Sequence, residues 1–506
     1  MKKLTLLIAI CTVVARLSGF LRMLVLTRIV GVGPIAEAFN YSNNIPNQWF
    51  TIISSALIIG MIPAYTSIES KQGEAKAMDF LNNIRTITMV LCLVISGLFL
   101  LGADFLIPIL TGYQGETLAL TIQFSRIVCL GVFSVALVQL HTGYLNLKES
   151  FIVPALISLP ANVILIVFFI LGRNHVIWMA WGNLISMIVQ AIIMVGYSKV
   201  KGFKRSWIFK PFDPAVRMMV RSSLPIVFVA IYGQIGDMMV VKLTTSVNGA
   251  TIMLYTTLII GLIQAVAITS ITSLIFPKLA RLVSLNQVQG VTRTMQSALS
   301  YILLLALPAT LGIMLMGHEV STLILGMVSE DHEAIALLGN LLQFQAIALL
   351  ANGLIDLLSK LFYAHKRTTI PMILNCVNVT LTVSFGYLLF SLGQGLQGIV
   401  LASALASLVV SLIFILISQK EYHLLQGRVM IALLVKVSLA LGLMALCVVV
   451  LKPIVFARLE FSLAAVVTVL AGALVYGITG YLLRIPEIKQ LVNSVLYRLR
   501  IWTHAS

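Results

Sequence analysis

The sequence predicts an all-α protein that crosses a membrane many times, and its composition, its hydrophobic runs and its charge placement each support this. Of its 506 residues, 59% are hydrophobic and 10% are charged, and the mean hydropathy is +1.04. Soluble domains carry about 25% charged residues, so a single water-soluble core is excluded. Apolar segments long enough to cross a bilayer recur along the whole chain, and we count about fourteen.

The apolar segments fall into two blocks of six followed by two more. They cover residues 4–30, 36–64, 80–106, 118–146, 151–172, 176–198, 217–244, 250–277, 294–317, 334–364, 369–392, 395–418, 429–452 and 459–483. We therefore predict an N-terminal six-helix lobe at 1–205 and a C-terminal six-helix lobe at 206–420. Two extra transmembrane helices at 421–484 and an amphipathic cytoplasmic tail at 485–506 complete the chain.

The two blocks look like copies of one unit. The second segment ends in Ile62-Pro63 and the eighth ends in Phe276-Pro277, each followed by a short charged loop. Because each block has an even number of segments, both copies enter the membrane in the same direction. Two parallel lobes with a site between them are typical of transporters, although a channel built by duplication shows the same pattern.

The formal net charge is +17, and the distribution of the basic residues among the loops indicates how the chain is oriented in the membrane. Basic residues concentrate in alternate loops, for example at 199–210, whereas the loop between the ninth and tenth segments is acidic at 330–333. By the positive-inside rule we expect both termini in the cytoplasm. The basic charge is therefore explained by the membrane, and we expect no nucleic-acid partner.

No enzyme signature is present. There is no phosphate-binding loop, no dinucleotide fingerprint, no pair of carboxylates with catalytic spacing and no zinc spacing, and the five cysteines lie in apolar runs. We expect no catalytic residue, no metal and no cofactor, and we expect transport driven by an ion gradient or the membrane potential.

The first apolar segment carries three arginines, Arg16, Arg22 and Arg28, at six-residue intervals. The segment spans ~40 Å as a helix, so Arg16 and Arg22 lie at hydrocarbon depth, where an unpaired arginine costs about 2.5–3.5 kcal/mol. We predict that Arg16 and Arg22 line a polar cavity and that Arg28 lies at the outer interface. The alternative is that Arg16 is structural and that Arg22 extends to the interface.

Other polar residues are predicted at membrane depth in both lobes. The first lobe has Arg126 and the second-segment amides Asn43, Asn44, Asn47 and Gln48, beside which Pro46 predicts a kink or a break. In the second lobe, Asp237 is a candidate ion site or charge partner. Asp356 and Lys360 are four residues apart and either pair within one helix or contribute to such a site.

A cavity with three fixed positive charges, those of Arg16, Arg22 and Arg126, and few acids favours an anionic ligand. Guanidinium groups form bidentate hydrogen bonds with phosphate and keep their proton. A pyrophosphate headgroup is therefore a more natural cargo than a cationic drug.

Several short runs carry a resemblance to a known family. Residues 15–22 read ARLSGFLR, residues 28–33 read RIVGVG and residues 36–39 read AEAF, followed by Ile45-Pro46-Asn47. In order and spacing these runs resemble the N-terminal signature of the MurJ/MviN lipid II flippases, within the multidrug/oligosaccharidyl-lipid/polysaccharide exporter superfamily.

The resemblance implies a V-shaped pair of lobes around a basic cavity, with a hydrophobic groove beside the two C-terminal helices. In that family the cavity receives the pyrophosphate-sugar head of lipid-linked peptidoglycan precursor in the bacterial cytoplasmic membrane, and alternating access moves it outward. Arg16, Arg22 and Arg126 match basic cavity positions of the family. Proteins of cell-wall synthesis are the partners that the resemblance implies.

Two stretches depart from the family pattern. Many members have arginines where this chain reads Gln48-Trp49-Phe50-Thr51 and Thr256-Thr257-Leu258. A flippase for another undecaprenyl-linked polysaccharide therefore remains an alternative. A cation-coupled drug antiporter of the same superfamily and a non-transporting envelope scaffold also stay open.

Overall fold

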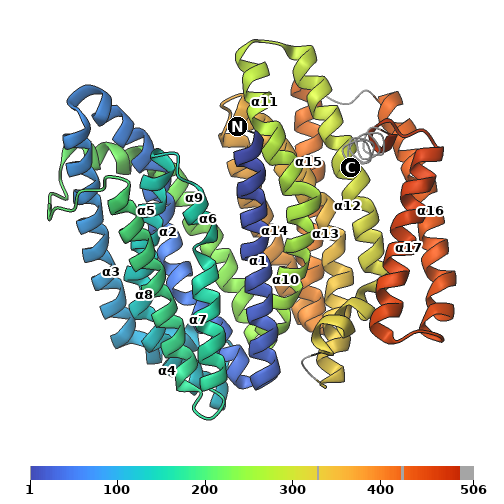
Figure 1. Cartoon of the computed structure of the whole chain (residues 1–506), viewed down its shortest axis with the longest axis horizontal. Coiled ribbons are helices and arrows are strands. Elements are labelled where there is room, and N and C mark those ends of the chain that lie inside the picture. Colours follow the sequence, from blue (N-terminus) through green and yellow to red (C-terminus); the bar gives the residue numbers. More distant parts are fainter. Residues whose placement is uncertain (1, 328–329, 423–426, 490–506) are drawn as a thin grey trace, which may run out of the picture. The chain divides into compact units, whose positions relative to one another are not determined.

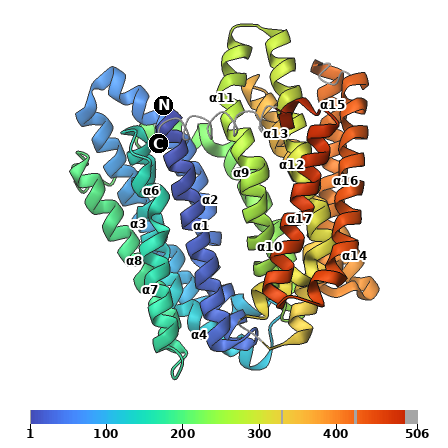
Figure 2. The same ribbon diagram turned by 45° about the vertical axis from the view of Figure 1, so that its right-hand side comes forward.

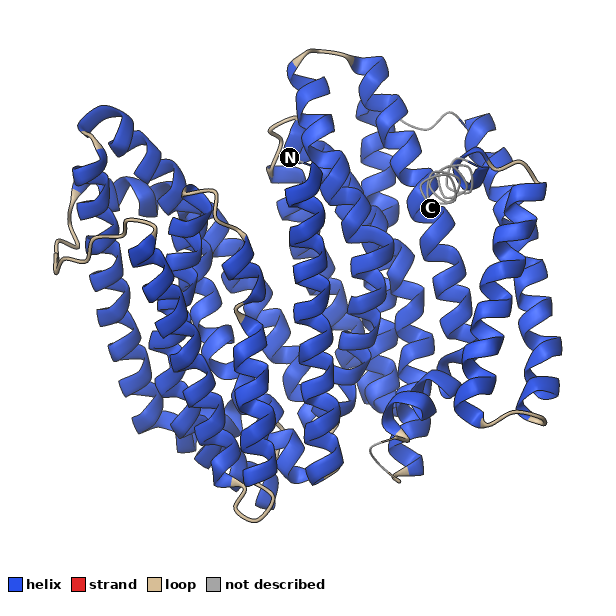
Figure 3. Cartoon of the chain, viewed as in Figure 1, coloured by secondary structure: helices blue, strands red, loops and turns tan. Residues whose placement is uncertain are grey.

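The computed structural model consists of α-helices joined by short loops (Figure 1), and the part of the chain that it describes contains no strand (Figure 3). It describes the backbone of residues 2–327, 330–422 and 427–489. Side chains are described over the same ranges apart from residues 2–10, 12, 46–60, 62–63, 222–226, 274 and 427–431. The prediction of an all-α fold is confirmed.

The chain forms two compact units. Unit 1 consists of Met1–Leu254 with Val328–Glu330, and unit 2 consists of Tyr255–Met327 with Asp331–Ser506. The predicted lobe boundary at 205/206 precedes the end of unit 1 because the next helix packs against helices of the N-terminal block. The predicted boundaries of the lobes, the extra helices and the tail stay predictions, and the tail beyond residue 489 lies outside the described residues.

Unit 1 is a helical bundle. Its helices are α1 (Lys2–Val30), α2 (Pro34–Gln72), α3 (Glu74–Leu110), α4 (Gly115–Val128), α5 (Val132–Leu147), α6 (Ile152–Leu156), α7 (Ser158–Leu171), α8 (Ile177–Val200) and α9 (Pro214–Thr245). A 3-10 turn, η1 (Cys129–Gly131), joins α4 to α5, and α10 (Ala250–Gln264) begins in this unit. Helix α2 packs against α3, α4, α5 and α9, while α1 packs against α6 and α7.

The core of unit 1 lies where α2, α3 and α5 meet. Met61, Tyr65, Leu81, Leu140 and Tyr144 are all buried there in one hydrophobic cluster. Helix α2 runs as a single helix through Pro46, so the predicted break at this proline does not occur.

Unit 2 contains the remaining helices. They are η2, a π-helical turn (Ala265–Thr269), α11 (Ser270–Ser284), α12 (Val288–Leu325), α13 (His332–Ala364), α14 (Thr369–Leu389), the turn η3 (Phe390–Gln394), α15 (Gly395–Tyr422), α16 (Gly427–Phe456) and α17 (Phe461–Leu482). Helix α13 packs against α12 and α15, and α14 against α15. Helices α16 and α17 lie side by side in both views (Figure 2) and pack against α12.

Each predicted apolar segment coincides with helix. Among the described residues, 11 helical stretches have the length and hydropathy to cross a membrane, and one of them, Thr369–Tyr422, joins two predicted segments. At that join Gly393 adopts a φ of 83°, which glycine accommodates most easily. The polytopic membrane fold is confirmed, whereas the count of fourteen crossings stays a prediction.

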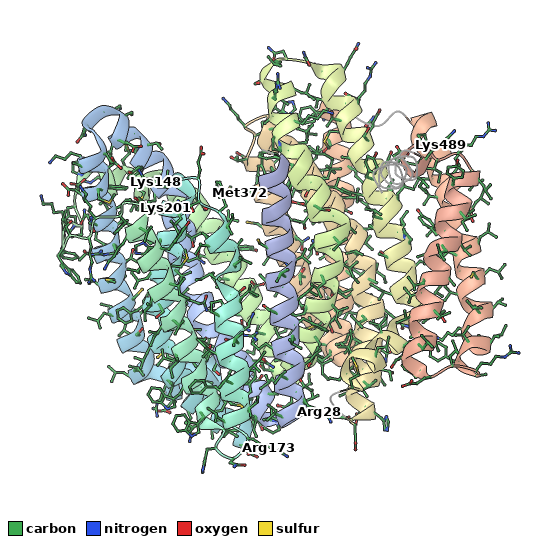
Figure 4. All side chains as sticks on the ribbon, viewed as in Figure 1. Arg28, Lys148, Arg173, Lys201, Met372 and Lys489 are labelled. Atoms are coloured by element: carbon green, nitrogen blue, oxygen red, sulfur yellow. The ribbon has the colours of Figure 1, made fainter. Side chains whose placement is uncertain are left out.

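Basic residues mark the two ends of unit 1. Arg28 and Arg173 lie at one end of the bundle, and Lys148 and Lys201 lie at the other (Figure 4). This separation matches the loops that the sequence assigns to opposite sides. That the Lys148 end faces the cytoplasm stays a prediction.

Candidate functional site

A polar pocket inside unit 1 brings Arg22 of α1 together with side chains of α2, α5, α7 and α8. The polar side chains that line it are Arg22, Asn43, Gln139, Ser158, Asn162, Asn183, Ser186 and Gln190. The cavity volume is about 310 Å³, and none of the described side chains that line it is acidic. Arg22 therefore shares this pocket with amides and hydroxyls, and apolar side chains such as Val135 and Leu165 complete the lining.

Hydrogen bonding holds α1 against α7 close to Arg22. The Asn162 amide Nδ2 donates to Ser18 Oγ at 2.8 Å, and the Ser18 hydroxyl donates to the Ala15 carbonyl at 2.7 Å. Ser18 lies about one turn before Arg22 on α1, so these bonds fix the direction in which Arg22 leaves the helix. A Cβ atom on Gly19 would lie 3.9 Å from Asn162 Nδ2, an ordinary contact distance.

Asn183 lines this pocket and carries a side-chain donor with no acceptor among the described residues. Asn183 is 1% exposed, and its Nδ2 atom is that donor. A buried donor without a partner costs about 1–3 kcal/mol.

The predicted site residues of the first lobe separate in the structure. Arg22 and Asn43 share the pocket. Arg16 is exposed and does not line it, because six residues of helix turn Arg16 about 120° away from Arg22. Asn44 donates through Nδ2 to the Asn40 carbonyl at 3.0 Å. The side chains of Asn47 and Gln48 lie outside the described residues.

Arg126 lies elsewhere in unit 1. Its Nη2 atom is 2.5 Å from Asp104 Oδ2 of α3, and the two side chains are 44% and 68% exposed. Asp104 lies between Leu101 and Phe105, which are 87% and 72% exposed, on the outermost face of α3. The structure therefore gives Arg126 a carboxylate partner outside the Arg22 pocket, and its role in ligand binding stays a prediction.

The charged residues predicted for the second lobe also lie in different parts of the structure. Asp237 is an exposed residue of α9, in unit 1. Asp356 and Lys360 form an intrahelical ion pair, which was one of the two predicted alternatives. The distance between Lys360 Nζ and Asp356 Oδ1 is 3.6 Å. Asp356 also accepts from the Thr272 hydroxyl at 2.6 Å, and the Lys360 ammonium lies 5.8 Å from the centre of the Phe276 ring.

A buried carboxylate that the sequence did not mark as functional lies at the start of α2. Glu37 is 0% exposed and accepts from the Tyr113 hydroxyl at 2.8 Å. It also accepts from the backbone N–H groups of Ala250 and Thr251, at 3.0 and 2.6 Å, where α10 begins. A carboxylate is favourable at a helix N-terminus, so Glu37 ties α2 and the α3–α4 loop to the first turn of α10.

The sequence contains a signal for the pocket amides. Gln139, Asn162 and Asn183 are single amides within apolar segments. Asn183 and Gln190 are separated by two helical turns on α8, so they share one face. Isolated amides at this spacing in a membrane helix indicate a polar face turned away from lipid.

A family model described as "Lipid II flippase MurJ" matches residues 26–470. A protein of Treponema pallidum named "Probable lipid II flippase MurJ" is 24% identical over 421 residues, covering 80% of this chain and 79% of its own. A protein of Thermotoga maritima with the same name is 22% identical over 510 residues, covering 97% and 98%.

Solved structures show the same fold. A structure described as "Lipid II flippase MurJ, inward closed conformation" superposes with a TM-score of 0.82 at 18% identity, covering 96% of this chain and 100% of that one. An inward-facing multidrug resistance MATE transporter of the MOP superfamily superposes with a TM-score of 0.66 at 16% identity, covering 82% and 98%. The fold is therefore shared by transporters with different cargo.

Proposed function

Because this chain belongs to the lipid II flippase MurJ family, we propose that it moves lipid II, the undecaprenyl-pyrophosphate-linked peptidoglycan precursor, across the cytoplasmic membrane for cell-wall synthesis. Its many apolar helices make it a multi-pass membrane protein. The observation that carries the proposal is the Arg22 pocket, in which a guanidinium and several amides meet no carboxylate.

The chemistry of the pocket suits a pyrophosphate. Arg22 offers a planar fork of N–H groups that stays charged, and Asn183 offers a buried donor with no other acceptor in the described structure. Asn43 and Gln190 add further amide groups to the lining. We assign Arg22, Asn43 and Asn183 to the pyrophosphate, and Gln139 and Gln190 to the adjoining sugar.

Unit 2 offers an apolar pocket that suits a polyprenyl tail. Side chains of α12, α13, α15 and α16 line it, and leucines predominate, among them Leu299, Leu303 and Leu357. Its cavity volume is about 220 Å³. Burial of apolar surface favours a chain of isoprene units here by about 25 cal/mol per Å².

Orientation and energy supply are part of the same proposal. The Lys148 end of unit 1 would face the cytoplasm with both termini, since basic residues are retained on that side. An ion gradient or the membrane potential would drive the cycle without a resident cofactor. Proteins of cell-wall synthesis would deliver and receive the lipid.

The test is complementation. A bacterial host is depleted of its own lipid II flippase, this chain is expressed, and growth and exposure of lipid II on the outer leaflet are followed. We expect the wild type to restore both and Arg22→Ala to restore neither at equal membrane abundance. Arg173→Ala, which removes an exposed arginine at the end of the bundle, is the matched control and should behave as wild type.

Two outcomes would overturn parts of this proposal. Full activity of Arg22→Ala would remove the pocket from the mechanism. Failure of a normally inserted wild-type chain would exclude lipid II and point to another undecaprenyl-linked glycan, to be sought among lipids that accumulate when the gene is deleted from its own host.

A further inference from the structure

The segment between α8 and α9, residues 201–213, is held tightly against unit 1; we call it the connector. Asn82 of α3 donates through Nδ2 to the Lys204 carbonyl at 2.8 Å and accepts from the Ser206 N–H at 3.0 Å. Asn83 donates to the Lys210 carbonyl at 2.9 Å and accepts from the Lys210 N–H at 2.7 Å. Two neighbouring amides thus bind the connector backbone at two points.

Further contacts hold the connector at its start and middle. Phe203 is 5% exposed and packs edge-on against His141 and Tyr144, with ring centroids 4.8 and 5.1 Å away. The Arg85 guanidinium donates to the Ser206 carbonyl at 3.0 Å and lies 5.5 Å from the centre of the Trp207 ring. The connector is therefore a fixed part of the unit 1 surface.

This fixed segment presents three large aromatic side chains to the outside. Trp207, Phe209 and Phe212 are 68%, 56% and 84% exposed. Because the backbone beside them is hydrogen-bonded, their exposure is built into the fold. Aromatic side chains held out at the end of a transmembrane bundle are typical of the membrane interface.

Basic side chains surround these aromatics. Lys204, Arg205 and Lys210 of the connector are exposed. At the start of α9, Arg217 and Arg221 are four residues apart on one face, and they line a shallow pocket together with Phe212, Pro214 and Met218. No acidic residue is among the described side chains that line this pocket, and Asp213 instead caps α9 by accepting from the Ala215 N–H at 2.8 Å.

The length of α9 places this pocket at headgroup depth. The helix ends at Thr245, and the rise to Arg221 is ~36 Å and to Arg217 ~42 Å. The hydrocarbon core is about 30 Å thick and the bilayer with its headgroups about 40–45 Å. With Thr245 at the opposite edge of the hydrocarbon core, both guanidinium groups lie in or near the headgroup layer.

We propose that the pocket formed by Arg217, Arg221, Phe212 and Met218 binds the headgroup of an anionic phospholipid from the leaflet at this end of unit 1. The two guanidinium groups bind the phosphodiester, and Phe212 inserts between the adjacent acyl chains. This site is separate from the Arg22 pocket, with which it shares no lining residue. It holds the connector end of unit 1 to the bilayer surface while lipid II is moved.

The experiment measures lipids retained by the purified full-length chain in native mass spectrometry, after equilibration with phosphatidylglycerol and phosphatidylcholine in equal parts. We expect preferential retention of phosphatidylglycerol by the wild type. The double variant Arg217→Gln/Arg221→Gln should weaken that preference about 25-fold, since each basic side chain near an anionic surface contributes a factor of about five. Phe212→Ser should lower the retention of both lipids by about tenfold and leave the preference for phosphatidylglycerol unchanged, because both lipids have the acyl chains that Phe212 contacts.

The matched control is Lys278→Gln/Arg281→Gln, which removes two exposed basic residues from α11 in unit 2. It should leave the preference unchanged, and the Arg217/Arg221 variant should still flip lipid II when fully inserted. Equal loss in the control and the test variant would overturn the proposal in favour of a general charge effect. Displacement of the lipid by a single-stranded RNA oligonucleotide of equal charge would overturn it in favour of a polyanion site.

Discussion

Arg22 in unit 1 and Lys360 in unit 2 are both partly buried cations on membrane-length helices, but their surroundings differ in kind. Lys360 has Asp356 one turn away on its own helix, at 3.6 Å. Arg22 shares its pocket with amides and hydroxyls of four other helices, and no carboxylate is among the described side chains that line it. A cation paired within its helix has its charge neutralised locally, whereas a cation among neutral groups keeps its charge for a ligand.

The carboxylates of the two units show the same contrast. Glu37 is fully buried in unit 1 and is held by a phenol and two backbone N–H groups. Asp356 in unit 2 has the Lys360 ammonium and the Thr272 hydroxyl. The neutral donors to Glu37 come from other segments, so Glu37 joins three segments of unit 1. Asp356 instead pairs with Lys360 on its own helix and accepts one hydrogen bond from Thr272 on a neighbouring helix.

The largest expected effect comes from making the Arg22 pocket resemble the unit 2 pair. Asn183→Asp places a carboxylate in the pocket, so Arg22 should gain an internal partner and lipid II exposure in the depleted host should fall to background. Asn183→Gln, which keeps an amide donor, is the control and should retain measurable activity. Equal activity of the two variants would mean that the charge of Arg22 is not used by the cargo.

Removal of the Glu37 carboxylate should have the largest effect on stability. Glu37→Ala leaves the Tyr113 hydroxyl and the Ala250 and Thr251 N–H groups without their acceptor, each at a cost of about 1–3 kcal/mol. We expect the midpoint of thermal unfolding in detergent to fall clearly. Glu37→Gln keeps one acceptor oxygen, so its midpoint of thermal unfolding should fall less. A fall as large as that of Glu37→Ala would mean that the negative charge of Glu37 provides the stability.

Disruption of the unit 2 pair should cost less. Asp356→Ala removes an ion pair whose side chains are each 31% exposed and one hydrogen bond, so we expect a loss of about 1–2 kcal/mol. The double variant Asp356→Ala/Lys360→Met should recover part of this loss, because no unpaired ammonium then remains. A double-mutant cycle of thermal unfolding measures the coupling, and zero coupling would contradict the pairing.

The smallest effect is expected at Arg126. Both side chains of its ion pair with Asp104 are exposed, and Arg126 does not line the Arg22 pocket. Arg126→Ala should therefore insert, unfold and restore growth much like the wild type, in contrast to Arg22→Ala. Loss of lipid II exposure in Arg126→Ala at normal abundance would return Arg126 to the ligand site.

The sequence by itself determined the features that depend on local spacing. Runs of apolar residues specify membrane-length helices because each helix satisfies its own backbone hydrogen bonds in a bilayer. Asp356 and Lys360 pair because four residues bring side chains together on any α-helix. The separation of Arg28 from Lys201 likewise followed from counting segments.

Only the tertiary structure decided which polar residues meet. Arg16, Arg22 and Arg126 have the same chemistry, yet Arg22 lies among amides, Arg16 is exposed and Arg126 reaches Asp104 on another helix. These outcomes depend on which helices are neighbours and how each is rotated about its axis. Lipid is as apolar as the side chains it contacts, so hydropathy cannot specify that rotation, and the close packing of helix against helix does.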